Sequence, residues 1–252
     1  MKILHFDQLE STNKYCELLD LSRVEEFTVV SAASQTAGVG QRGSHWESQP
    51  GENLTFSMVL KPTFLSAARQ YELTKAVALG IVDWVRPVMA ATASALATPA
   101  QAVRIKWPND IYVGQRKLCG VLVSNHVGDG VLRSSVVGVG LNVNQTQFGA
   151  WVPNPVSLAM LTGVRHDTRM CLEGLADALA RRYGQLRAGA AQAIGEEYEA
   201  ALLRRGEEAA YAYRGKPLRA TLRGVDRYGH LLLTTADGVE LACDMGELKF
   251  LF

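Results

Sequence analysis

The sequence predicts an α+β fold, in which a mixed β-sheet with flanking helices is followed by a small β-domain. Two patterns in the first part predict this fold: apolar residues recur at helical spacing in several segments, and β-branched runs bounded by glycine turns predict strands. The tail differs, because from Lys216 onward short alternating strands are broken at 226–229 and 237–238. We therefore predict two domains, residues 1–210 and 211–252, the second a small β-barrel.

The helices are predicted from caps and periodicity. Ser11 or Thr12 can cap a short helix through Leu19, and Ser66 can cap a long helix that Pro87 ends. The two later helices are predicted near Arg169–Leu186 and Ala191–Arg205. The Ala/Thr-rich residues 89–101 are compatible with a helix tail or a loop.

The strands of the first domain are predicted from β-branched and alternating runs. They are Phe27–Ser34, Leu54–Leu60, Val103–Trp107, Ile111–Val113, Lys117–Ser124 and Leu132–Val143.

Composition excludes several classes of protein. The 252 residues carry 26 Lys plus Arg against 25 Asp plus Glu, so the net charge of +1 gives no basic surface for nucleic acid. The four cysteines are scattered, which suits reduced thiols better than disulfides or a zinc site. The N-terminus has no apolar signal region and no run is long enough to span a membrane, so we expect a soluble, cytoplasmic protein.

The segment GVGQRG at 38–43 matches the dinucleotide fingerprint G-x-G-x-x-G. That fingerprint needs a helix to begin at its third glycine, whereas here Pro50 and Gly51 follow and lead into a strand. The Rossmann interpretation therefore fails. What remains is a flexible loop whose backbone N–H groups and Arg42 can wrap an anion, or simply an exposed glycine turn.

Two neighbouring motifs supply candidate polar groups. In KWPND, Asn109 and Asp110 follow a proline turn, where they either satisfy local backbone or face a nucleotide and its Mg²⁺. In RKLCGVLV, Lys117 is either an edge-strand lysine or a fixed cation that offsets charge when a carboxylate attacks an α-phosphate. Gly120 would let a flat ligand approach the strand backbone closely.

A third motif, GVGLNVN, places two glycines inside a strand. Such glycines mark either a bulge or a close approach by another group. Asn142 at its end is either a turn residue or a partner for the adenine edge, since a carboxamide offers both a donor and an acceptor.

In this order, the motifs resemble the biotin protein ligase family. The resemblance is carried by LESTNKY (9–15), SQTAGVGQRGSHWESQPGENLTFSMVL (34–60), RIKWPNDIYVGQRKLCGVLV (104–123) and VGVGLNVN (137–144), and it covers nearly the whole chain. It implies a catalytic domain of the class II synthetase-like type, a C-terminal SH3-like barrel, and ATP-dependent formation of biotinyl-5′-AMP. The biotinyl group then passes to a lysine of a biotin carboxyl carrier domain.

The resemblance also implies roles for individual residues. Lys117, Arg42 and Asp110 would be catalytic, with Asp110 also near Mg²⁺. The implied biotin-binding residues are Ser11, Thr12, Asn13, Gln35, Gly38, Lys117 and Gly120. The implied nucleotide-binding residues are Gly40, Arg42, Trp46, Asn109 and Asn142.

The sequence departs from the family pattern in the loop, where Val39 and Gln41 stand at positions that are frequently arginine. Many family members also carry an N-terminal DNA-binding domain, but here the STN motif begins at Ser11, so we expect a ligase without that domain. The resemblance leaves a homodimer open.

The rival interpretations are a lipoate or octanoate ligase of the same fold, a regulator without activity and a plain interaction module. KWPND and GxGxRG favour biotin over the first. The catalytic residues argue against the second, and the third ignores the first 150 residues.

Overall fold

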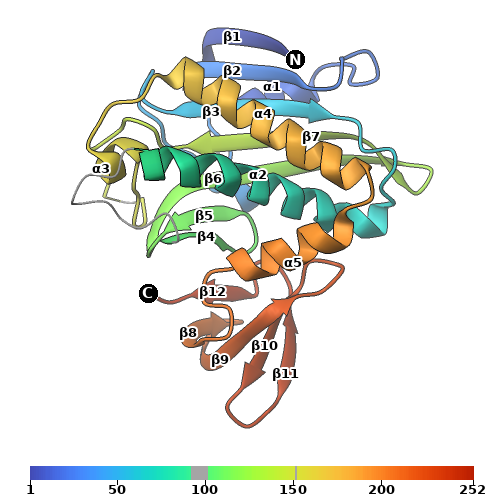
Figure 1. The fold of residues 1–252 in the computed structure, drawn as a ribbon, viewed down its shortest axis with the longest axis vertical. Helices are drawn as coiled ribbons and strands as arrows, with labels where there is room; N and C mark the ends of the chain where they lie inside the picture. The colour runs from blue at the N-terminus through green and yellow to red at the C-terminus, as the bar shows by residue number, and fades with distance from the viewer. Residues whose placement is uncertain (92–101, 151) are drawn as a thin grey trace.

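The computed structural model describes residues 1–91, 102–150 and 152–252. Its first domain is built on a seven-stranded sheet with the order β1-β2-β3-β7-β6-β5-β4 (Figure 1). The strands are β1 (Lys2–Leu9), β2 (Thr28–Gln35), β3 (Leu54–Leu60), β4 (Val103–Lys106), β5 (Asp110–Val113), β6 (Arg116–Gly128) and β7 (Val131–Leu141). Of the neighbouring strands in this sheet, β1 and β2 run parallel and the other pairs run antiparallel. The predicted mixed sheet is therefore confirmed.

Helices cover the two faces of this sheet unequally. On one face lie α2 (Gln70–Ala91) and α4 (Thr168–Arg187), which pack against each other and bury most of the core (Figure 1). The short α1 (Thr12–Glu17) lies on the opposite face over β2, β3 and β7. The remaining helices are α3 (Leu158–Thr162), α5 (Ala191–Ala201) and the 3-10 turns η1 (Gln41–Gly43) and η2 (Ala67–Arg69). Much of the α1 face is therefore left for a binding site.

The expectation that Pro87 ends the long helix is wrong, because Pro87 lies inside α2. Pro87 is exposed, so the carbonyl that loses its intrahelical partner lies on the solvent side of the helix. Val82, Val85 and Met89 continue the buried stripe past the proline at helical spacing. Burial of this stripe carries the helix to Ala91; residues 92–101 of the Ala/Thr-rich segment lie outside the described residues.

Other boundaries also differ from the predictions. Strand β1 was not predicted, because its half-exposed edge position leaves only a weak apolar alternation. Helix α5 ends at Ala201 instead of Arg205, since Leu202 is extended and Arg204 adopts a positive φ of 65°. Ser11 is the N-cap residue of α1 but makes no side-chain cap hydrogen bond, and its buried side chain instead lines the cavity described below.

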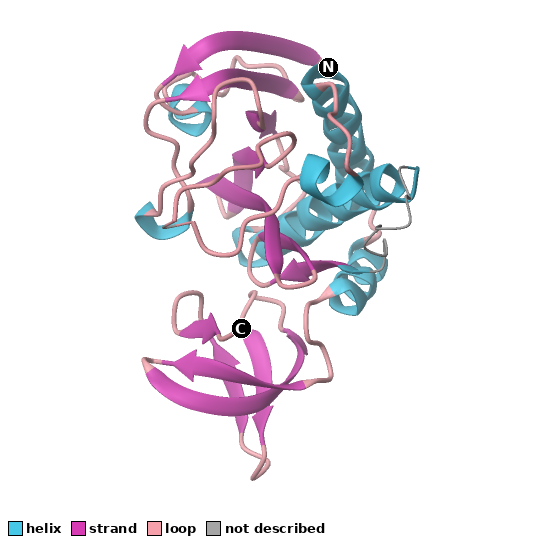
Figure 2. Cartoon of the chain, turned by 90° about the vertical axis from the view of Figure 1, so that its left-hand side faces the viewer, coloured by secondary structure: helices cyan, strands magenta, loops and turns pink. Residues whose placement is uncertain are grey.

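The tail forms a second, antiparallel sheet with the order β11-β10-β9-β8-β12. Its strands are β8 (Glu208–Tyr213), β9 (Lys216–Val225), β10 (Leu231–Thr235), β11 (Glu240–Cys243) and β12 (Leu248–Phe250). It begins earlier than the predicted first strand at Lys216, and Figure 2 shows it as a separate lobe below the first domain.

The two lobes are joined by specific contacts. Trp107 Nε1 donates a hydrogen bond to the carbonyl of Gly229 at 2.9 Å, and the Tyr71 ring packs against Gly229. Gly229 has a positive φ of 96°, and a Cβ there would lie 2.5 Å from Tyr71 Cδ2. A glycine is therefore required at this junction. No helix in the described ranges is long and apolar enough to cross a membrane.

Candidate active site

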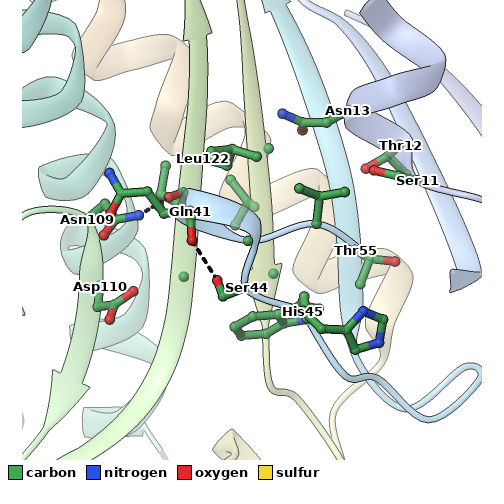
Figure 3. Close-up of a pocket in the computed structure, with 18 of the residues that line it drawn as sticks. Ser11, Thr12, Asn13, Gln41, Ser44, His45, Thr55, Asn109, Asp110 and Leu122 are labelled. Carbon is green, nitrogen blue, oxygen red and sulfur yellow. Dashed lines mark hydrogen bonds between the residues drawn. The ribbon is translucent and has the colours of Figure 1, made fainter. Parts of the chain in front are cut away.

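A cavity of about 250 Å³ lies on the face of the sheet that carries α1. Figure 3 shows Asn109 and Asp110 at one end, and Ser11, Thr12 and Asn13 at the other. The loop that carries Gln41, Ser44 and His45 passes between these two groups of residues. The cavity therefore joins a charged end to an uncharged polar end under one loop.

Three glycines form the floor of this cavity. Gly120 of β6 pairs directly with Gly140 of β7, and Gly138 lies two residues away on the same face. The register of β3, β6 and β7 is regular around them, so the bulge interpretation of GVGLNVN is wrong. A Cβ at Gly140 would overlap the Trp46 indole, and one at Gly138 would overlap the Asn13 carboxamide. The glycines therefore permit the close approach of other groups.

The polar end is organised around Ser57, a buried hydroxyl in the middle of β3. Ser57 Oγ lies 2.8 Å from Thr12 Oγ1 and donates to Asn13 Oδ1 at 2.6 Å, while the Thr12 backbone N–H donates to Gln35 Oε1 at 2.7 Å. Asn13 Nδ2 is buried and has no hydrogen-bond partner among the described residues. A buried donor without a partner is costly, so this end of the cavity is suited to a ligand with an uncharged acceptor.

The charged end contains one carboxylate between two lysines. Asp110 Oδ1 lies 2.8 Å from Lys117 Nζ, and Asp110 Oδ2 lies 3.9 Å from Lys106 Nζ. All three side chains are largely buried, with exposed fractions of 13% for Asp110, 26% for Lys117 and 18% for Lys106. Within the described lining Asp110 is the sole carboxylate, so this corner has an excess of positive charge suited to an anion.

Lys117 is held in place through its backbone. Its N–H donates to the carbonyl of Asn154 at 2.7 Å, and its carbonyl accepts from the N–H of Val156 at 2.9 Å. Pro155 thus forms an isolated parallel bridge with Lys117 at the start of β6. This contact fixes the base of the side chain whose ammonium enters the cavity.

A second cavity, of about 420 Å³, adjoins the first. It is mainly apolar, and its lining includes Phe148, Val152, Pro153 and Pro155 together with Asn142. The residues common to both cavities are Ser44, His45, Trp46 and Lys117. Lys117 is therefore the cation that faces both.

Asn142 lies in the second cavity, away from the first. Its Nδ2 donates to the carbonyl of Val156 at 3.1 Å and to that of Lys117 at 3.4 Å. The amide group is therefore oriented by the same segment that fixes Lys117. Asn109 is oriented in a similar way, since its Nδ2 donates to the carbonyl of Val121.

The loop over the sheet is closed by its own hydrogen bonds. The Trp46 N–H donates to the carbonyl of Gly38 at 3.0 Å, and the Gly40 N–H donates to that of Ser44 at 2.6 Å. Trp46 Nε1 is buried without a hydrogen-bond partner in the described part of the chain, and Lys117 Nζ lies 5.6 Å from the centre of the Trp46 ring. The loop thus places the Trp46 ring beside the fixed lysine, with its Cζ3 edge over Gly120.

Most of the predicted site residues lie together. Those that line the first cavity are Ser11, Thr12, Asn13, Gln35, Gly40, Trp46, Asn109, Asp110, Lys117 and Gly120. Gly38 does not line it but supports Trp46, and Asn142 lines the second cavity. Arg42 lies in η1, and its side chain is outside what the structure describes.

Several residues of the site were missed by the sequence interpretation. Ser57, which supports the lining through Thr12 and Asn13, could have been found as the polar residue at the centre of the apolar run LTFSMVL. Lys106 stood unassigned inside KWPND, although it faces the same carboxylate as Lys117. Phe148 and Pro155 lie in an irregular segment, so no periodicity could have placed them.

The residues fit a metal only in part. The described residues include no group of three His, Cys, Asp or Glu placed to hold an ion, and Asp110 already faces two ammonium groups. A single carboxylate suits a Mg²⁺ that is held chiefly by substrate phosphates and water. A metal held by protein side chains alone lacks a ligand set in the described residues.

An apolar cavity and a polar cavity that share one fixed lysine define a site where a small acid and a nucleotide can meet. The class this indicates is the carboxylate-activating ligases. The profile of the Biotin/lipoate A/B protein ligase family matches residues 5–142, which is more than half of the chain. The chain belongs to this family.

Individual relatives agree with this assignment. The biotin–[acetyl-CoA-carboxylase] ligase of Paracoccus denitrificans is 33% identical over 212 residues, covering 81% of this chain and 82% of that protein. The bifunctional ligase/repressor BirA of Bacillus subtilis is 28% identical and covers 94% of this chain and 71% of its own length. Among solved structures, the biotin protein ligase from Aquifex aeolicus in complex with biotin and ATP superposes with a TM-score of 0.80. That alignment covers 99% of both chains at 23% identity, so it supports the fold.

Proposed function

We propose that this chain is a biotin protein ligase, which activates biotin with ATP and transfers it to a lysine of a carrier protein. The observation that carries the proposal is the position of Lys117 at the junction of the two cavities. A carboxylate and a phosphate repel each other, and a fixed cation between them offsets this repulsion and the charge that develops during attack.

Biotin occupies the first cavity in this proposal. Its ureido oxygen accepts from the buried donor of Asn13, beside Ser11, Thr12 and Gln35. Its ring lies along the glycine floor near Gly120, and its carboxylate reaches Lys117. The order of these groups along the cavity follows the order of the ligand, from uncharged urea to charged acid.

ATP occupies the second cavity with its adenine. Both amide hydrogens of Asn142 bond to backbone carbonyls, so its carbonyl oxygen is the group that would accept from the adenine amino group. Phe148 and Pro155 supply apolar surface for the base. Asp110 of the first cavity is the residue that would face a Mg²⁺ brought in as MgATP. When bound, the ion would be held mainly by phosphate oxygens and would withdraw charge from the phosphates.

In the first step a carboxylate oxygen of biotin attacks the α-phosphorus. The bond between that phosphorus and the bridging oxygen breaks, and pyrophosphate leaves with the electron pair. Lys117 balances the charge on the α-phosphate, and the Trp46 ring lies beside its ammonium. Side chains of this site need not become nucleophiles, because the substrate supplies its own.

In the second step the amine of the carrier lysine attacks the acyl carbon, and AMP leaves. The incoming ammonium gives one proton to solvent before attack, and the nitrogen gives up a second as the bond between the acyl carbon and the phosphate oxygen breaks. The loop keeps water from the anhydride until the carrier docks. In this proposal the C-terminal sheet corresponds to the SH3-like barrel that the resemblance implies.

The direct test is mass spectrometry of a carrier domain incubated with the purified protein, biotin and ATP. We expect one biotinyl group on one carrier lysine, dependent on ATP. Replacing biotin by lipoate or octanoate in the same assay tests the related ligases. Modification by those acids, with biotin inert, would contradict the proposal.

A further inference from the structure

Lys106 is a second cation at the charged end of the cavity that the first step, as described, does not use. Its Nζ lies 3.9 Å from Asp110 Oδ2, whereas the shorter contact of that carboxylate, 2.8 Å, is to Lys117. One carboxylate therefore faces two ammonium groups, and the charge of Lys106 is incompletely balanced. Lys106 also lines the cavity directly.

Aromatic rings hold the Lys106 ammonium on its other sides. Its Nζ lies 5.4 Å from the centre of the Tyr112 ring and 5.1 Å from that of Phe250. A ring face attracts a cation but carries no net charge, so it holds the ammonium without neutralising it. Burial lowers the pKa of Lys106, as does the nearby Lys117, while Asp110 opposes both effects. An arriving anion would therefore relieve an unfavourable environment.

Phe250 belongs to the C-terminal lobe, on strand β12. The same lobe also contacts the loop over the cavity, since Gln41 Nε2 donates to Met245 Sδ at 3.4 Å. The C-terminal lobe thus contacts both Lys106 and the loop over the cavity.

We infer that Lys106 binds the pyrophosphate that leaves in the first step, and that Phe250 of the C-terminal sheet positions it for this task. The inference rests on the proposed function. With adenine in the second cavity and the α-phosphate at Lys117, the β- and γ-phosphates extend past Asp110 toward Lys106. As the bond to the α-phosphorus breaks, charge accumulates on the pyrophosphate oxygens, where this second cation can balance it.

The inference is tested by the reverse of the first step, in which pyrophosphate and biotinyl-adenylate give ATP and biotin. We expect Lys106→Gln to raise the KM for pyrophosphate by about tenfold or more, the size expected for one charge-assisted contact. Transfer from supplied biotinyl-adenylate to the carrier should stay within about threefold of wild type, because that step contains no pyrophosphate.

Lys75→Gln is the matched control, because Lys75 Nζ also lies near two rings, 5.7 Å from Tyr71 and 5.8 Å from Tyr198, but does not line the cavity. This control variant should leave the KM for pyrophosphate and the rate of transfer from biotinyl-adenylate near their wild-type values. Phe250→Leu should raise the KM for pyrophosphate in the same direction as Lys106→Gln, and Phe250→Tyr, which keeps the ring, should not.

An unchanged KM for pyrophosphate in Lys106→Gln would overturn the inference, as would an equal loss in the transfer step. If wild-type protein made no biotinyl-adenylate at all, the proposed function itself would fail. The two failures are therefore distinguishable.

Discussion

At the scale of single residues, the account depends on how firmly Lys117 is fixed. Its backbone is hydrogen-bonded on both sides to residues 154–156, and its ammonium is paired with Asp110. A side chain held in this way loses little freedom when the reacting groups arrive, so its ammonium is already in place for the transition state.

Lys117→Ala should therefore reduce the rate of biotinyl-adenylate formation by about 10²–10³-fold, the usual size for one preorganised electrostatic contact. Biotin binding should weaken only modestly, because most of the cavity is unchanged. Pyrophosphate exchange measures the first quantity and calorimetry the second. The neighbouring, exposed Arg116→Ala is the control, and activity of Lys117→Ala within about threefold of wild type would refute the assigned role.

At this scale, residue type and motif singled out Lys117 and Asp110 as candidates, whereas Ser11 and Thr12 entered the site only through the family resemblance. Residue type and motif could not show that Asp110 faces two lysines, because Lys106 and Lys117 lie on different strands and meet only through the β5 pairing. The same holds for Ser57, which meets Thr12 and Asn13 across about 45 residues of sequence.

At the scale of elements, the glycines of β6 and β7 make room for the loop that lies over them. The three glycines leave the sheet surface bare, and the Trp46 ring fills the space above Gly140 and Gly120. The loop can therefore lie close to the sheet with its indole next to Lys117.

Gly140→Ala should displace Trp46, because the new methyl group would overlap the indole ring. We expect adenylate formation to fall by about 10²-fold, the size associated with a displacement of about 1 Å at a reacting site. The melting temperature should stay close to that of wild type, since the change lies at a cavity. Gly195→Ala in α5, where the methyl group meets nothing within 4 Å, is the control and should gain about 0.4–1 kcal/mol of stability.

The loop should also respond to ligands as a unit. Backbone hydrogen bonds within residues 38–46 close this loop on itself, and glycine-rich lids commonly order over their substrates. Trypsin cleavage after Arg42 should therefore slow when biotin and ATP are both present. Equal cleavage rates with and without the ligands would argue against a closing lid.

The elements themselves were largely predictable, and the failures have physical causes. Leu54–Leu60 was predicted residue for residue as β3, because every position of this central strand is buried. The end of α2 was predicted wrongly at Pro87. The rule that proline ends a helix assumes that solvent cannot replace the lost hydrogen bond. Strand β1 escaped because an edge strand exposes half of its residues.

At the scale of the whole molecule, the lobes meet through a turn of the C-terminal sheet. This turn, residues 226–230, includes Gly229, which contacts Trp107 and Tyr71 of the first lobe. It also includes an ion pair between Asp226 and His230. The hydrogen bond from His230 to Asp226 is the main reason that the pKa of His230 is raised above 6.5. This turn therefore makes the junction sensitive to pH.

The direction in which stability changes with pH follows from the raised pKa of His230. A histidine whose pKa is raised in the folded state adds stability below its unfolded pKa, near 6.5, and loses it as the pH rises through the folded pKa. His230→Gln should therefore lower the melting temperature at pH 6 and have much less effect at pH 9. An Asp226→Asn, His230→Gln double variant should show no further pH-dependent loss; equal effects of His230→Gln at both pH values would contradict the assignment.

The C-terminal β-strands were predictable from the change in patterning near Lys216, but their contact with the rest of the chain was not. Trp107 and Gly229 are far apart in the sequence, and the local sequence around either residue does not predict their contact. The same is true of Phe250 and Lys106, whose contact links the tail to the charged end of the cavity.

The most direct test of the central claim is a crystal structure with biotinyl-5′-AMP bound. We expect the biotin ring in the cavity beside Asn13, adenine beside Asn142, and Lys117 Nζ within hydrogen-bond distance of the anhydride oxygens. A structure in which Lys117 points away from the anhydride, or in which both halves of the ligand share one cavity, would contradict it.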